Sequence, residues 1–256
     1  MVGNVGSSET IRRIPRMTRD MAVLLGLLYT DGCVSRRQPN SWRIYFAVTS
    51  EQLIKLFRDS AIAAFHLEPS RVRMGTTRDG LYKAVIDSKE IGSYLTSEFG
   101  TFRTLRFKDG KLTNARLPLQ QLIESGYARD FLRSAFTCDG GLRFYPASRS
   151  GRDGGTRWLI RTVFLSCTHP LLRDDYTMLL EHMGIRASNS ATDGKLKIER
   201  EHDIRLFAAK IGFVPGVKVT GNSKFWQGCE KNALLEKMIA SYEIPSKFYQ
   251  LPVFVR

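Results

Sequence analysis

The sequence contains few of the residue patterns that disulfide scaffolds, zinc sites and membrane spans require. Its four cysteines are scattered without a C-x-x-C pair, which excludes both a disulfide scaffold and a cysteine-based zinc site. Its four histidines form no H-x₃-H or H-E-x-x-H arrangement, so a histidine-based zinc site is not expected either. No apolar run approaches the roughly 20 residues that a transmembrane helix needs. We therefore expect an intracellular protein in a reducing compartment, either the cytoplasm or an organelle of a eukaryotic host.

One segment imitates a secretory signal peptide. A basic stretch that ends at Arg19 precedes an apolar run over Met21–Tyr29. Glu9 and Asp20 dilute the positive charge, however, and the run continues into Thr30-Asp31-Gly32 without a small-residue cleavage site. We therefore interpret the segment as part of the fold.

Acidic residues are scarce relative to basic ones. The 256 residues include 39 Lys and Arg against 25 Asp and Glu, which gives a net charge of +14 at pH 7. The first 128 residues hold 19 basic and 12 acidic side chains and the rest hold 20 and 13, so each half carries +7. A basic tail on a neutral domain is thereby excluded, and a polyanion is the expected partner, with nucleic acid ahead of a membrane surface. A hydrophobic share of 43% excludes wholesale disorder.

Four landmarks occur twice in the same order, which indicates an internal duplication. The apolar segment that ends in Asp31-Gly32 has a counterpart that ends in Asp139-Gly140. Three further pairs follow these two: the alternating segments that begin at Trp42 and Trp158, the turns Asp79-Gly80 and Asp193-Gly194, and the segments 98–100 and 210–212. The repeated order predicts two copies of one supersecondary unit.

Each copy is predicted to fold as an αββαββα unit, and the fold class as α+β. An apolar helix that ends at Asp-Gly is followed by two strands, a helix (51–65 or 170–183), two more strands and a third helix. Alternation in the first copy predicts an antiparallel sheet with one face covered by helices and one basic face. In the second copy we expect Trp158, Ile160, Thr162 and Phe164 on one face, and Arg157 and Arg161 on the other, basic face.

The repeats divide the chain into five predicted parts: an N-terminal extension (1–16), a first repeat (17–100), a basic linker (101–125), a second repeat (126–245) and a C-terminal tail (246–256). Two basic sheets side by side would form a saddle that fits a DNA groove. The side chains expected to bind DNA on this saddle are Arg36, Arg37, Arg43, Tyr45, Arg71, Arg73, Lys83, Arg143, Arg149, Arg152, Arg157, Arg161, Lys195 and Lys197.

The two apolar helices carry a recognisable motif. The segment Leu24-Leu-Gly-Leu-Leu-Tyr-Thr-Asp31-Gly32 resembles the LAGLIDADG motif of homing endonucleases. The segment Leu132-Arg-Ser-Ala-Phe-Thr-Cys-Asp139-Gly140 is similar but weaker, with Ser134 in place of the motif's glycine. Two matches, each at the head of a repeat, resemble the single-chain, double-motif form of this family, over roughly residues 17–245.

The residues of the motif give it a physical rationale. Small residues at Gly26 and Ser134 would let the two helices approach backbone to backbone, which brings Asp31 and Asp139 into one site. Two carboxylates placed together repel and raise each other's pKa, and a divalent cation with a preference for oxygen ligands relieves that repulsion. Aspartate is unfavourable at a helix C-terminus, so its repeated placement there favours a functional role over mere helix capping.

The resemblance implies further features of the site. It implies two or three divalent ions, Mg²⁺ above all, held by Asp31 and Asp139 with the backbone carbonyls of Thr30 and Cys138 nearby. The family often places a Gln, Asn or Lys close to the acids to organise water, and this sequence departs from that pattern. Lys89 and Arg200, just after the fourth strand of each repeat, are the basic partners that we expect instead.

The function implied is a site-specific double-stranded DNA endonuclease that cuts both strands across the minor groove and leaves short 3′ overhangs. The resemblance also implies an intron-encoded protein. We expect it to be monomeric, because the duplicated unit replaces the second subunit of a homodimer. Two alternatives use the same basic faces: a maturase that binds intron RNA, and a DNA-binding regulator that has lost cleavage. Binding to duplex DNA and intron RNA at matched salt would separate them.

Overall fold

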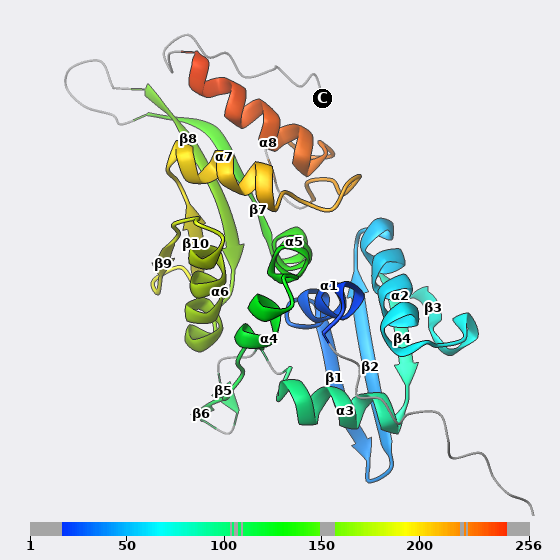
Figure 1. Ribbon diagram of the computed structural model, residues 1–256. Coiled ribbons are helices and arrows are strands. Elements are labelled where there is room, and N and C mark those ends of the chain that lie inside the picture. Colours follow the sequence, from blue (N-terminus) through cyan, green and yellow to red (C-terminus); the bar gives the residue numbers. More distant parts are fainter. Residues whose placement is uncertain are drawn as a thin grey trace, which may run out of the picture.

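The computed structural model describes residues 17–102, 104, 107–108, 110–148, 157–220, 223 and 225–244. These residues form two αββαββα units, each with its own four-stranded antiparallel sheet, so the predicted α+β fold class is confirmed (Figure 1). The first unit comprises α1 (Arg19–Leu28), β1 (Gly32–Gln38), β2 (Ser41–Val48), α2 (Glu51–Phe65), β3 (Arg73–Thr76), β4 (Tyr82–Asp87) and α3 (Lys89–Phe99). The second comprises α5 (Ala128–Cys138), β7 (Gly140–Ser148), β8 (Arg157–Ser166), α6 (Pro170–His182), β9 (Ser188–Ser190), β10 (Lys195–Ile198) and α7 (Glu201–Lys210).

The remaining elements connect or extend the two units. Between them lie the short strands β5 (Phe107–Lys108) and β6 (Lys111–Leu112) and the helix α4 (Leu119–Glu124). After the second unit comes α8 (Lys231–Ala240). Two short 3₁₀ turns, η1 (Pro69–Arg71) and η2 (Ser241–Glu243), complete the described elements.

The two sheets share one topology and one register. Their strand orders are β1-β2-β4-β3 and β7-β8-β10-β9. Gly32 pairs with Phe46 in the first sheet, and Gly140 pairs with Leu165 in the second. The duplication therefore holds residue by residue, but it equates Trp42 with Arg161. The sequence-based match of Trp42 with Trp158 was three residues out of register.

This register reverses the predicted faces of β8. Leu159, Val163 and Leu165 are buried against the helices of the second unit, whereas Trp158 is 39% exposed on the opposite face. The error has a physical origin, because β8 carries apolar residues on both faces and its alternation is therefore ambiguous. In the first sheet Ile44 and Phe46 are buried as predicted.

Helices α1, α2, α3 and α6 begin where a side chain accepts a hydrogen bond from one of their first N–H groups. The Thr18 hydroxyl accepts from the Met21 N–H at 3.2 Å and caps α1. The α2 helix is capped by Ser50 and covers the predicted range, and α6 is capped by the His169 ring. In the described part of the chain, no helix combines the length and apolar character that crossing a bilayer needs.

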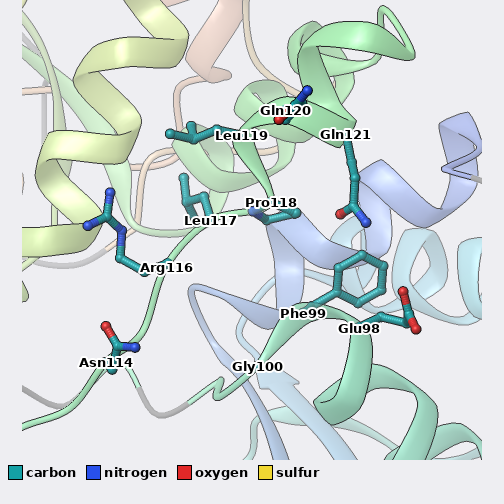
Figure 2. Close-up of a pocket in the computed structure, with 10 residues that line it drawn as sticks. All are labelled: Glu98, Phe99, Gly100, Asn114, Arg116, Leu117, Pro118, Leu119, Gln120 and Gln121. Atoms are coloured by element: carbon teal, nitrogen blue, oxygen red, sulfur yellow. The ribbon is translucent and has the colours of Figure 1, made fainter.

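A connecting strap, defined as residues 110–118, fastens the first unit to the second. The fully buried carboxylate of Asp175 on α6 accepts from Arg116 Nε and Nη2 at 3.0 and 2.6 Å, and from the Leu117 N–H at 2.8 Å. The buried His169 ring nitrogen Nε2 lies 2.7 Å from the Thr113 carbonyl oxygen. Figure 2 shows Arg116 directed away from Glu98 at the end of α3. On the other side, the Tyr29 hydroxyl at the end of α1 donates to the Arg116 carbonyl at 2.8 Å, so the strap is hydrogen-bonded to both units.

Candidate active site at the contact of α1 and α5

Helices α1 and α5 cross at the centre of the molecule, between the two sheets (Figure 1). Their contact is too close for any side chain at Gly26, since a Cβ built there would lie 2.5 Å from the Phe131 carbonyl oxygen and 2.8 Å from Ser134 Cβ. Ser134 itself is buried, and its hydroxyl donates to the Asp130 carbonyl within α5. Small residues at these two positions thus produce the close approach that the motif predicts.

The two acids sit where these helices end. Asp31 lies between α1 and β1, and Asp139 is the last residue before β7. Burial raises the pKa of Asp139 to about 7, and the neighbouring charge of Asp31 adds to the shift. Partial desolvation by the surrounding protein also raises the pKa of Asp31, although its side chain keeps contact with solvent. The helix contact therefore places two carboxylates within electrostatic range of each other.

A third charged group, Lys231, lies at this centre and was not among the predicted site residues. Its Nζ donates to the carbonyl oxygens of Thr137 and Gly140, both at 2.7 Å, and only 7% of the residue is exposed. Burial lowers the pKa of Lys231 to about 8, while Asp31 and Asp139 act in the opposite direction. Lys231 in turn lowers the pKa of both acids. It therefore partly compensates two negative charges that would otherwise repel.

Thr30 and Cys138, whose carbonyls were predicted to lie near the metal ions, flank the acids. The Thr30 hydroxyl donates back to the carbonyls of Gly26 and Leu27, both at 3.0 Å. Burial, with the charges of Asp31 and Asp139, raises the pKa of the Cys138 thiol far above its usual range. The thiol is consequently neutral, which leaves its backbone carbonyl as the only metal ligand that Cys138 offers.

The chemistry of the donor set suits a hard divalent cation that also binds substrate. Among the described residues, no group of three or more His, Cys, Asp or Glu side chains could hold a metal ion. The acid pair alone supplies carboxylates, and Mg²⁺ typically binds one or two of these and completes its octahedron with water and phosphate oxygens. The pair fits a cation that is completed by a phosphodiester, and it does not fit a closed structural metal site.

The predicted basic partners Lys89 and Arg200 lie away from this centre. Lys89 Nζ donates to Asn40 Oδ1 at 3.0 Å in the hairpin turn, at the far end of β1 from Asp31. The seven residues of β1 separate Asp31 from that turn, a distance of roughly 24 Å. Arg200 precedes α7, five residues beyond Lys195, which pairs with Ser166 beside Asp139. Strand direction carries both side chains outward, so neither prediction holds for the conformation described here.

The uncovered face of the first sheet carries most of the side chains predicted to bind DNA there. Pairing places Arg43, Tyr45, Arg73 and Lys83 on this face. Arg43 forms a bidentate ion pair with Asp87 at 2.8 and 3.1 Å, and Arg73 bonds the same carboxylate. These two arginines hold the pKa of Asp87 below its usual range. Arg37 and Arg71 are exposed at the edges of the sheet.

Two predicted DNA-binding arginines lie on the covered faces instead. Arg36 pairs with Trp42, which packs on Gly92 of α3, and its Nη2 donates to the Pro39 carbonyl. Arg161 Nε donates to the Ser241 hydroxyl at 2.7 Å, and its guanidinium lies 4.4 Å from the centre of the Tyr242 ring. Both corrections follow from register, since opposed residues on neighbouring strands share a face.

The second sheet presents fewer of its predicted cations than the sequence suggests. Arg143, Lys195 and Lys197 lie on the uncovered face. Arg149 and Arg152 lie outside the described residues, as does the side chain of Arg157. The predicted extensions over 1–16 and 246–256 also lie outside them.

A pocket of about 540 Å³ opens beside the strap, between the end of α3 and the start of α4 (Figure 2). Its lining is mostly amide and apolar, with Asn114, Gln120, Gln121 and Phe99, and Glu98 supplies its one carboxylate. A single acid cannot reproduce the paired carboxylates at the helix ends. The candidate chemistry therefore stays with Asp31 and Asp139.

The fold and site together define a class: two pseudo-symmetric αββαββα units joined by two helices, each of which ends at an acid. Solved structures of homing endonucleases are similar to the chain. Variants of I-DmoI share 16% identity, with 75% of this chain and 90% of that chain covered and a TM-score of 0.45. The structure of I-WcaI bound to its DNA recognition sequence shares 12% identity, with 83% and 93% covered and a TM-score of 0.46.

A third similar structure is the LAGLIDADG homing endonuclease I-SmaMI bound to cleaved DNA. It shares 11% identity, with 76% of this chain and 84% of that chain covered and a TM-score of 0.42. No model of a protein family matches the sequence, and no curated protein matches it either. The function proposed below consequently rests on the geometry of this chain.

Proposed function

We propose that the protein is a single-chain endonuclease of the LAGLIDADG type that hydrolyses both strands of a specific DNA duplex. The observation that carries the proposal is the convergence of Asp31 and Asp139 at one helix contact, beside the buried cation Lys231. Basic side chains on the uncovered faces of both sheets, such as Arg43 and Lys195, support a duplex as the polyanion. We further propose Mg²⁺ as the cofactor, short 3′ overhangs as the product ends, and a monomer as the active form.

The residues of the chain have distinct parts in this mechanism. Asp31 and Asp139 would hold the divalent ions, which supply activation of water and stabilisation of the leaving oxygen during phosphodiester hydrolysis. The close contact at Gly26 lets the two helices pack together and so keeps their ends, with Asp31 and Asp139, near each other. Lys231 anchors the end of α5 through the Thr137 and Gly140 carbonyls and so orients Asp139. Paired cations on the sheets would hold the duplex across these groups.

A cleavage screen against a randomised duplex library, with Mg²⁺ and with EDTA, tests the proposal. We expect cleavage of a small set of related sequences with Mg²⁺ only. Asp31→Asn should reduce the cleavage rate at least 100-fold while it preserves binding of the selected duplex, because the amide removes a metal ligand and leaves the sheets intact. The matched control is Asp59→Asn, which alters an exposed carboxylate on α2.

Three results would contradict the proposal. Cleavage by Asp31→Asn at the wild-type rate would exclude the acid pair as the catalytic centre. Tight binding of the duplex without cleavage under any divalent ion would favour a non-cleaving regulator. Preferential binding of structured RNA over duplex DNA at matched salt would favour a maturase.

A further inference from the structure

The uncovered face of the second sheet carries an aromatic ring that lies flat beside the candidate active site. Phe164 on β8 pairs with Gly141 on β7. A Cβ built on Gly141 would lie 3.2 Å from Phe164 Cζ and 3.4 Å from Cε1, so the ring extends over the place where a side chain would stand. Gly141 follows Asp139 by two residues, and Ser166, two residues after Phe164, donates its N–H to the Asp139 carbonyl. The Phe164 ring therefore lies next to the candidate active site.

Two cations frame this ring. The Arg143 guanidinium lies 5.4 Å from the ring centre, and Lys195 Nζ lies 5.2 Å from it. Both distances are typical of cation–π contacts, which hold the cations over the face of the ring and tie the three side chains together. The surface therefore combines one partly exposed apolar plane with two positive charges, a combination that suits the edge of a base between two phosphates.

The first sheet differs at the equivalent positions. The shared register equates Phe164 with Tyr45, Gly141 with Cys33 and Lys195 with Lys83. Both units have a lysine at this position. The phenol of Tyr45 in the first unit, however, corresponds to the phenyl ring of Phe164 in the second, which can neither donate nor accept a hydrogen bond. Beyond the buried Thr162, Ile160 and the 39% exposed Trp158 add apolar surface further along the same face of β8. A polar face in one unit thus corresponds to a partly apolar face in the other.

We infer that this face recognises thymine through its C5-methyl group, with Phe164 as the specificity-determining residue. The inference rests on the proposed function, which lays the sheets along a DNA duplex. Thymine's methyl is the one apolar group that base pairs present in the major groove, and apolar side chains such as Phe read it by contact. Arg143 and Lys195 bind the flanking phosphates, and their positive charge selects a nucleic acid rather than an apolar protein segment as the occupant.

Substitution of deoxyuridine for thymine removes only this methyl group and therefore tests the inference directly. In the duplex selected by the library screen, thymines are replaced by deoxyuridine in one half-site at a time, and the dissociation constant is measured with EDTA. We expect a loss of about four-fold per contacted thymine in one half-site only, the value of one buried methyl group. Phe164→Ser should abolish this loss, whereas Phe164→Leu should retain part of it.

Tyr45→Ala is the matched variant on the first sheet, and it should leave the deoxyuridine effect unchanged. Thermal unfolding of each variant confirms that it is folded, and Phe164→Leu keeps the test available if Phe164→Ser is not. Equal affinity for thymine and deoxyuridine duplexes in both half-sites, or an effect that persists in Phe164→Ser, would overturn the inference while the nuclease stands. Failure of any duplex to be selected would overturn the proposed function and the inference together.

Discussion

Asp139 is the residue whose chemistry depends most on its surroundings. Burial and the charge of Asp31 raise its pKa to about 7, and the ammonium of Lys231 opposes both. Lys231 is held in place by two backbone carbonyls rather than by an ion pair, so its position does not depend on the ionisation of either acid. The positive charge beside the two acids is therefore anchored to the backbone at the end of α5.

A pH dependence of stability follows at this residue. Between pH 4 and pH 7 the folded state binds a proton at Asp139 that the unfolded state releases, so ionisation in this window opposes folding. In EDTA, we expect the free energy of unfolding of Asp139→Asn, relative to wild type, to increase as pH rises from about 4 to about 7. Urea denaturation at a series of pH values measures this difference. A difference that is constant across the window would contradict the raised pKa.

At the scale of elements, the contact of α1 and α5 both joins the units and sets the site. We expect Gly26→Ala to destabilise the fold by about 1–3 kcal/mol, because its Cβ would overlap the Phe131 carbonyl and Ser134 Cβ. The cleavage rate should fall more than the affinity for DNA, since the acids separate while the sheets persist. Ser134→Ala keeps the Cβ and should cost less than about 1 kcal/mol. Equal stability of both variants in thermal unfolding would contradict this account.

The elements also mark where sequence-based inference succeeds and fails. The repeat, the limits of α2 and the cap of α1 can be predicted because each depends on residue types and their spacing along the chain. The face of Arg161 does not, because β8 is apolar on both faces and only pairing with β7 decides which one is covered. Lys231 escapes prediction for a related reason. It lies 92 residues after Asp139, in an extension without a recognised counterpart, and only the fold brings it to the acids.

At the scale of the molecule, the two units are interlocked rather than simply adjacent. The strap, which follows the first unit, supplies Arg116 and the Leu117 N–H to the buried Asp175 of the second unit. In the other direction, the extension of the second unit approaches α2 of the first, where Gly216 lies beside Gln52. Contacts from the strap and from the extension therefore hold the two sheets in place relative to each other. They also hold the surface across which the proposed duplex would lie.

Removal of the Arg116 charge from the strap should lower the free energy of unfolding of the whole molecule. Arg116→Ala leaves the Asp175 carboxylate buried with one backbone donor, and we expect a loss of about 2 kcal/mol, less than for a fully buried pair because Arg116 is half exposed. Arg58→Ala breaks an exposed ion pair on α2 and should change stability by at most about 0.5 kcal/mol. Denaturant unfolding compares the two. Similar midpoints would show that the strap contributes little.

The duplication is exact in the topology of the sheets but not in the side chains that they carry, and this gives the molecule a direction. Lys231 enters the centre from the second unit and bonds the end of α5, and the uncovered faces differ between Tyr45 and Phe164. A duplex laid across such a surface meets a different environment at each end, so turning it around would not restore the same contacts. A homodimer of identical halves lacks this property. Under the proposed function, the chain would thus distinguish upstream from downstream in its target.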